Sequence, residues 1–102
     1  MMAPDRSNES EGGQFPSQES RDLLRTALSA YVATREESPV CEALGVLARE
    51  AQARQIYAER MLVAFKRTWG EMPEVKAIPN EKDRKLLLDR LIKLCIDAYY
   101  AR

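Results

Sequence analysis

The stretch from Val40 to Trp69 constrains the fold of this chain most strongly. It contains no proline, and its apolar residues recur at the spacing of a helix rather than alternating as in a strand. At about 100° per residue, one narrow face collects Val40, Leu44, Leu47, Ala51, Ala58, Leu62, Phe65 and Trp69. The spacing therefore predicts the central helix, or a closely linked helix pair, of an all-α domain.

Ile56 and Val63 do not fit this face, because they fall among the charged and amide residues of the opposite side. Two interpretations compete. The helix breaks between Ala53 and Tyr57, so that its second half has its own phase, or it is continuous and the two residues make a second contact, for example with another chain. A continuous helix would far exceed the mean length of about 11–12 residues, so a break is favoured.

Sequence signals on both sides of this stretch predict further helices. Ser17, Ser38 and Asn80 are suited to cap helix N-termini, and Gly70 is suited to end a helix. Residues 73–75 are expected to form a single helical turn between two prolines. The predicted helices cover residues 17–36, 39–54, 57–69 and 80–100.

The last predicted helix has a wide apolar stripe: Leu87, Leu88, Leu91, Ile92, Leu94, Cys95, Ala98 and Tyr99. A stripe of that width has to contact more than one neighbouring helix. The expected fold is therefore an all-α bundle of three to four helices, forming a single domain over residues 17–102. Residues 1–16 are rich in Gly, Ser, Pro and Glu, so we expect a disordered N-terminal arm there.

The residue types argue against catalysis. The chain has no histidine and none of the common nucleophile, phosphate-binding or metal-binding motifs. Glu50 and Glu59 are the carboxylates considered for a metal site, but both lie on or near the polar side, so no metal, cofactor or enzymatic activity is expected. Without an export signal or an apolar run long enough to span a membrane, Cys41 and Cys95 suggest reduced thiols in a cytoplasmic protein.

Three functional hypotheses follow. The leading one is a cytoplasmic protein–protein interaction module, an adaptor or regulator that forms a homodimer through apolar helix surface. Its candidate interface residues are Ile56, Val63, Tyr99 and Tyr100, with one of the two tyrosines facing outward.

The third hypothesis is a thiol redox switch at Cys41, near a helix N-terminus. The competing interpretation, which we favour, is that both cysteines are small buried core residues.

The second hypothesis is a helical nucleic-acid-binding transcriptional regulator. Its candidate basic contacts are Lys66, Arg67, Lys82, Arg84 and Lys85. The chain has no net charge, and acidic residues alternate with basic ones in the last helix. Ion pairs four residues apart, Glu81–Lys85 and Asp89–Lys93, would explain that alternation without any ligand, so nucleic-acid binding remains the alternative.

Overall fold

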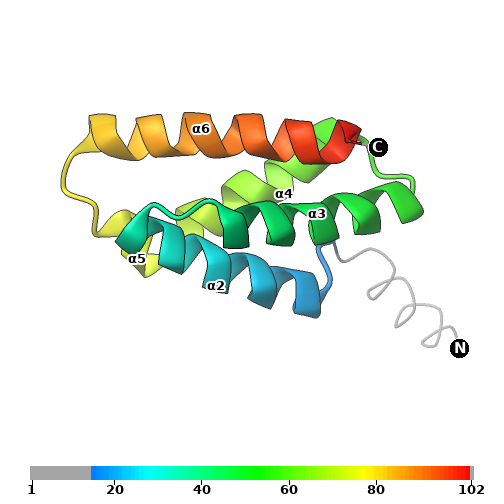
Figure 1. The fold of residues 1–102 in the computed structure, drawn as a ribbon, viewed down its shortest axis with the longest axis horizontal. Helices are drawn as coiled ribbons and strands as arrows, with labels where there is room; N and C mark the ends of the chain where they lie inside the picture. The colour runs from blue at the N-terminus through cyan, green and yellow to red at the C-terminus, as the bar shows by residue number, and fades with distance from the viewer. Residues whose placement is uncertain (1–14, 102) are drawn as a thin grey trace, which may run out of the picture.

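The computed structural model describes residues 15–101, and the regular structure in that range is entirely helical (Figure 1). Its helices are α2 (Gln18–Thr34), α3 (Ser38–Ala53), α4 (Ala58–Glu71), α5 (Pro73–Lys76) and α6 (Glu81–Tyr100). The all-α prediction is confirmed. The described residues form five helices rather than three or four, because the expected turn after Pro73 is a short helix of its own. The predicted N-terminal arm lies outside the described residues, except for residues 15 and 16.

Helix α3 is the centre of the bundle. Helices α2 and α6 both pack along it, and α4 contacts every other helix of the described chain. Figure 1 shows α2 beside α3, α6 on the other side of α3, and α4 crossing the bundle obliquely. Helices α4 and α6 lie close together near the C-terminus and diverge toward α5. This divergence opens the space in which the candidate site lies.

The predicted break in the central stretch is confirmed. Helix α3 ends at Ala53, α4 starts at Ala58, and Gln55 between them has a positive φ of 59°. The N–H of Ile56 donates a 2.8 Å hydrogen bond to the carbonyl of Ala51. This turn directs Ile56 back into the core, where its exposed fraction is 7%. The prediction that Ile56 is an exposed anchor is therefore wrong, because the turn resets its orientation.

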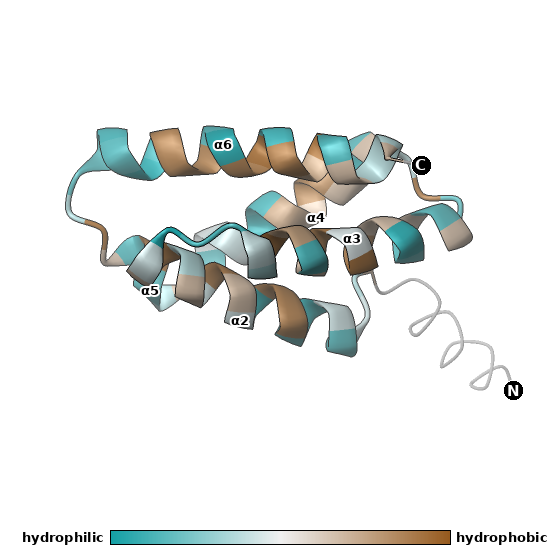
Figure 2. Ribbon diagram, in the orientation of Figure 1, coloured by the Kyte–Doolittle hydropathy of each residue, from teal (hydrophilic) through white to brown (hydrophobic). Residues whose placement is uncertain are grey.

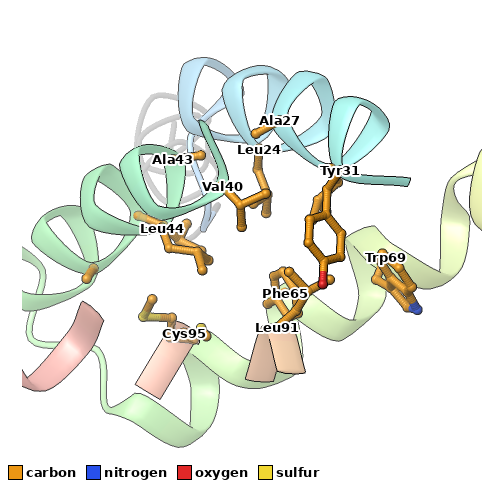
Figure 3. Packing of buried hydrophobic residues seen from close by; sticks show 14 of the residues in the cluster. Leu24, Ala27, Tyr31, Val40, Ala43, Leu44, Phe65, Trp69, Leu91 and Cys95 are labelled. Carbon is orange, nitrogen blue, oxygen red and sulfur yellow. The ribbon is translucent and has the colours of Figure 1, made fainter. Parts of the chain in front are cut away.

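The core contains residues from every helix of the described range. Figure 3 shows Leu24 and Tyr31 of α2, Val40 and Leu44 of α3 and Phe65 of α4 converging on one cluster. Helix α6 contributes less than its stripe suggested. Leu91 and Cys95 are buried, but the rest of the stripe is only partly buried against the cluster: Leu87, Leu88, Ile92, Leu94, Ala98 and Tyr99.

The helix ends confirm two of the predicted caps and correct two others. The side chains of Ser17 and Asn80 accept hydrogen bonds from the first backbone N–H groups of α2 and α6. Ser38 is instead the first residue of α3, with Glu37 at the cap position and no side-chain cap. Helix α4 continues through Gly70, because the stop is set by Pro73, which favours the extended conformation at the residue before it.

Glu37 has a different role, which joins the α2–α3 connection to α6. Its carboxylate accepts two 2.9 Å hydrogen bonds from the guanidinium of Arg90. This paired contact lowers the pKa of the Glu37 carboxyl. The pair fixes α6 against the α3 side of the bundle, opposite the flank that faces α4.

Candidate functional site

Helices α4, α5 and α6 enclose an open hollow of about 650 Å³, which we call the basic groove. Trp69, Val75 and Leu88 supply its apolar lining, and Gly70 and Glu81 also border it. The basic residues that line it are Lys66, Lys76, Lys82, Arg84 and Lys85. The hollow lies where α4 and α6 diverge.

The positive charge of the groove is largely unneutralised. Glu81, the acidic residue of the lining, pairs with Arg84 at 3.5 Å. Within residues 15–101, none of the four lining lysines forms an ion pair. The predicted Glu81–Lys85 pair does not form, because Glu81 is engaged by Arg84, and the predicted Asp89–Lys93 pair does not form within this range either. The lysine ammonium groups are thus available to an anionic ligand.

Apolar residues follow the groove-lining residues along α6 and precede them along α4. Ile92 follows Leu88 by four residues, so the two side chains lie on the same side of the helix. Both are partly buried against the core. On α4, Leu62 precedes Lys66 by four residues and is also partly buried against the core. Apolar side chains therefore lie one helical turn beyond the basic lining on both α6 and α4.

The structure separates the predicted basic contacts into two places. Four of the five line the basic groove: Lys66, Lys82, Arg84 and Lys85. Arg67 lies in a different crevice, of about 190 Å³, between α2 and α4, because consecutive residues of a helix point about 100° apart. Lys76 also lines the groove, although no pattern in the sequence singled it out. The short helix α5 places Lys76 there, and the helical turn expected at Pro73 was the one indication of α5 in the sequence.

The predicted interface residues also fall in different environments. Val63 is 55% exposed and Tyr100 is 65% exposed, whereas Tyr99 is half-buried. The rings of Tyr99 and Tyr100 meet edge to face with centroids 5.1 Å apart. The expectation that one tyrosine faces outward is confirmed, and the outward residue is Tyr100.

Glu50 is the centre of a polar cluster that sequence reasoning missed. Its carboxylate accepts hydrogen bonds from the backbone N–H of Ser17 at 3.0 Å, from the hydroxyl of Ser20 at 2.7 Å and from Arg54 at 2.7 Å. Burial raises the pKa of this carboxyl, but the hydrogen bonds from Ser20, Arg54 and Ser17 outweigh burial and leave the pKa lowered. The carboxylate joins α2 to α3, so the arrangement is that of a structural contact.

The two cysteines are placed differently. Cys95 is buried as predicted, and burial raises the pKa of its thiol to about 12. Cys41 is exposed, so the expectation that it is a buried core residue is wrong. Its neighbour Val40 takes the core position instead. Cys41 borders a second hollow, of about 540 Å³, between α3 and α6. Among the described residues, no group of three or more Cys, Asp and Glu is placed to hold a metal ion.

This chain matches no protein-family model, no curated protein and no solved structure. None of the helices between residues 15 and 101 has the length and apolar character needed to cross a bilayer. What the fold and the site define is an all-α domain with a basic groove and incompletely covered apolar helix surface.

Proposed function

We propose that this protein is a small protein–protein interaction module, an adaptor or regulator without catalytic activity. The observation that carries the proposal is the incomplete burial of α6. Only Leu91 and Cys95 of that helix are buried, while Leu86 is 63% and Ile96 is 38% exposed. Figure 2 shows hydrophobic turns along much of α6. Apolar helix surface of this kind gains stability when a partner covers it.

Self-association is the form of this function that the outer face of α6 supports. In a twofold interface, if residue i of one chain contacts residue j of the other, then residue j of the first chain also contacts residue i of the second. In α6, Asp89 and Lys93 lie two residues before and after Leu91, and Leu86 and Ile96 lie five residues before and after it. Antiparallel pairing of two α6 helices would therefore place Asp89 at the level of Lys93, and Leu86 at the level of Ile96, twice each.

Light scattering on a size-exclusion column tests the homodimer. We expect the wild-type protein to approach twice the monomer mass as its concentration rises. The double substitution Leu86→Glu/Ile96→Glu should give a folded monomer, because it places charges at the apolar contacts of the proposed interface. Leu23→Glu is the matched control, since Leu23 is an exposed leucine of α2. A wild-type protein that remains monomeric at high concentration refutes self-association.

A nucleic-acid-binding regulator is the second candidate, and the gathering of Lys66, Lys82, Arg84 and Lys85 in one groove favours it. Such binding is expected to weaken steeply with salt, because each neutralised phosphate releases counterions. Titration of a labelled duplex DNA and a single-stranded RNA at increasing salt tests the idea. Binding that is absent at low salt, or unchanged by Lys66→Glu/Lys85→Glu, refutes it.

A further inference from the structure

We infer that the basic groove is the docking site for an acidic amphipathic helix of a partner protein. The inference rests on the proposed function as a protein-binding module but not on self-association. The groove lies on the flank of α6 that faces α4, and the proposed dimer uses the adjoining exposed side of α6, which carries Leu86 and Ile96.

Charge complementarity indicates that the partner surface is negatively charged. Five basic side chains and one acidic side chain line the groove, and the acidic one, Glu81, is engaged by Arg84. The four lysines have no ion-pair partner in the described part of the chain. A ligand that places carboxylates along the rim would neutralise these charges, and complementary charge raises both the rate and the specificity of association.

The apolar lining defines the partner as amphipathic. Leu88 is the partly exposed apolar residue of the lining, and the buried side chains of Trp69 and Val75 lie beneath it. Ile92, also partly exposed, follows Leu88 one helical turn further along α6. The span from Lys82 to Ile92 is about 15 Å long, or about three helical turns. Amphipathic helices bind in such grooves by inserting apolar residues from successive turns, with polar residues at the edges.

The same groove offers nucleic acid its positive charge but fewer of the other contacts that such a ligand uses. Trp69 is only 4% exposed, so its ring does not offer a face on which a base could stack. A helix N-terminus can bind phosphate through free N–H groups, but at α6 the side chain of Asn80 already accepts hydrogen bonds from the N–H groups of Lys82 and Asp83. Phosphate contacts would depend on the lysine and arginine side chains alone.

Fluorescence offers a direct assay, because Trp69 is the single tryptophan of the chain and lines the groove. The probe is a synthetic amphipathic peptide of about 18 residues, with leucine on one face and glutamate on the flanks. Two control peptides keep its length. One replaces every glutamate with lysine, and the other keeps the composition but scrambles the order so that no apolar face forms. A single-stranded DNA oligonucleotide of similar charge tests the nucleic-acid alternative.

We expect the acidic amphipathic peptide to bind and to change the Trp69 emission, whereas the lysine and scrambled peptides bind at least about tenfold more weakly. Lys66→Glu/Lys85→Glu should weaken binding of the acidic peptide by about tenfold or more and should favour the lysine peptide instead. Arg49→Glu/Arg60→Glu is the matched control. Both arginines are exposed on α3 and α4, outside the groove, and their reversal should leave peptide binding unchanged.

Each contrary result overturns the inference in a recognisable way. Equal binding of the acidic and lysine peptides would show that charge does not select the partner. Oligonucleotide binding without acidic-peptide binding would assign the groove to nucleic acid, and binding of neither would show that the groove takes no such ligand. Light scattering on the same variants keeps the two proposals distinguishable. A Lys66→Glu/Lys85→Glu protein that loses the peptide but remains dimeric retains the proposed self-association.

Discussion

The hydroxyl of Tyr99 donates a 2.7 Å hydrogen bond to the backbone carbonyl of Ile56. This contact joins the C-terminal end of α6 to the turn between α3 and α4, 43 residues earlier in the chain. It holds α4 and α6 together at one end, while at the other end α5, which packs against α4 and α2, and the loop after it separate α4 from α6 along the chain. The two helices therefore diverge in the direction that opens the basic groove.

Removing this hydroxyl should destabilise the fold. We expect Tyr99→Phe to lower the free energy of unfolding by about 1 kcal/mol, because the half-buried carbonyl of Ile56 loses its side-chain donor. Urea denaturation followed by circular dichroism measures the change. Tyr100→Phe is the matched control, since no hydrogen bond of the Tyr100 hydroxyl is seen among residues 15–101, and it should leave the midpoint unchanged. Equal effects of the two substitutions would contradict the structural role of Tyr99.

Glu50 should make stability depend on pH in the acid range. Its pKa is lowered in the folded protein, so its contribution to stability is complete above the ordinary glutamate value of about 4.3 and is lost as the pH falls through the lower folded-state pKa. Glu50→Gln should cost about 2 kcal/mol near neutral pH. The difference from wild type should shrink in acid.

Denaturation curves recorded across the acid range test this prediction. Glu59→Gln is the control, because Glu59 is an exposed glutamate of α4, and its loss should change the free energy of unfolding by less than about 0.5 kcal/mol. If the gap between Glu50→Gln and wild type stayed constant with pH, the hydrogen bonds to the carboxylate would not be the cause.

Leu91 should contribute more to stability than any exposed leucine, because it is fully buried where α6 meets the core (Figure 3). Leu91→Ala should lower the free energy of unfolding by about 2–5 kcal/mol, through lost apolar burial and the cavity that remains. Leu23→Ala on the exposed side of α2 should cost less than about 1 kcal/mol. Thermal denaturation of both variants measures the difference, and similar losses would show that α6 does not complete the core as described.

The two thiols should react at different rates with a thiol-specific reagent such as dithionitrobenzoate. Cys41 is exposed and should react rapidly in the native protein. Cys95 is buried, and the pKa of about 12 keeps its thiol protonated, so it should react only after denaturation. Cys41→Ser should abolish the rapid phase and Cys95→Ser should preserve it. A rapid phase that survives Cys41→Ser would mean that Cys95 is accessible. Loss of the rapid phase in Cys41→Ser would show only that Cys41 is accessible. A redox switch at Cys41 further requires that Cys41→Ser abolishes a response of the protein to oxidant.

Much of the helical pattern could be predicted from the sequence. Helical spacing identified the central stretch, and the misfit of Ile56 and Val63 correctly located a break between residues 53 and 57. The caps at Ser17 and Asn80 were predictable, because a capping side chain bonds to backbone groups only two or three residues away. The end of α4 was misjudged, since a glycine permits a helix to end but does not require it.

The candidate site was predicted only in part. Lys66, Lys82, Arg84 and Lys85 were selected as basic residues, but nothing in their spacing indicated that α4 and α6 would bring them to one hollow. Lys76 was missed because α5 has too few residues to show a period. The Glu50 cluster was also missed, because its donors at Ser17 and Ser20 come from a helix about thirty residues earlier.

The sequence by itself determined where helices begin, where the central stretch breaks and which faces are apolar, because these properties depend on residues within one or two turns of each other. Only the tertiary structure decided how much of each face is covered. Ile56 became core through the α3–α4 turn, and the flanks of α6 stayed open because α4 diverges from it. Burial and charge clustering depend on how whole helices pack, and the spacing along any one helix does not specify that.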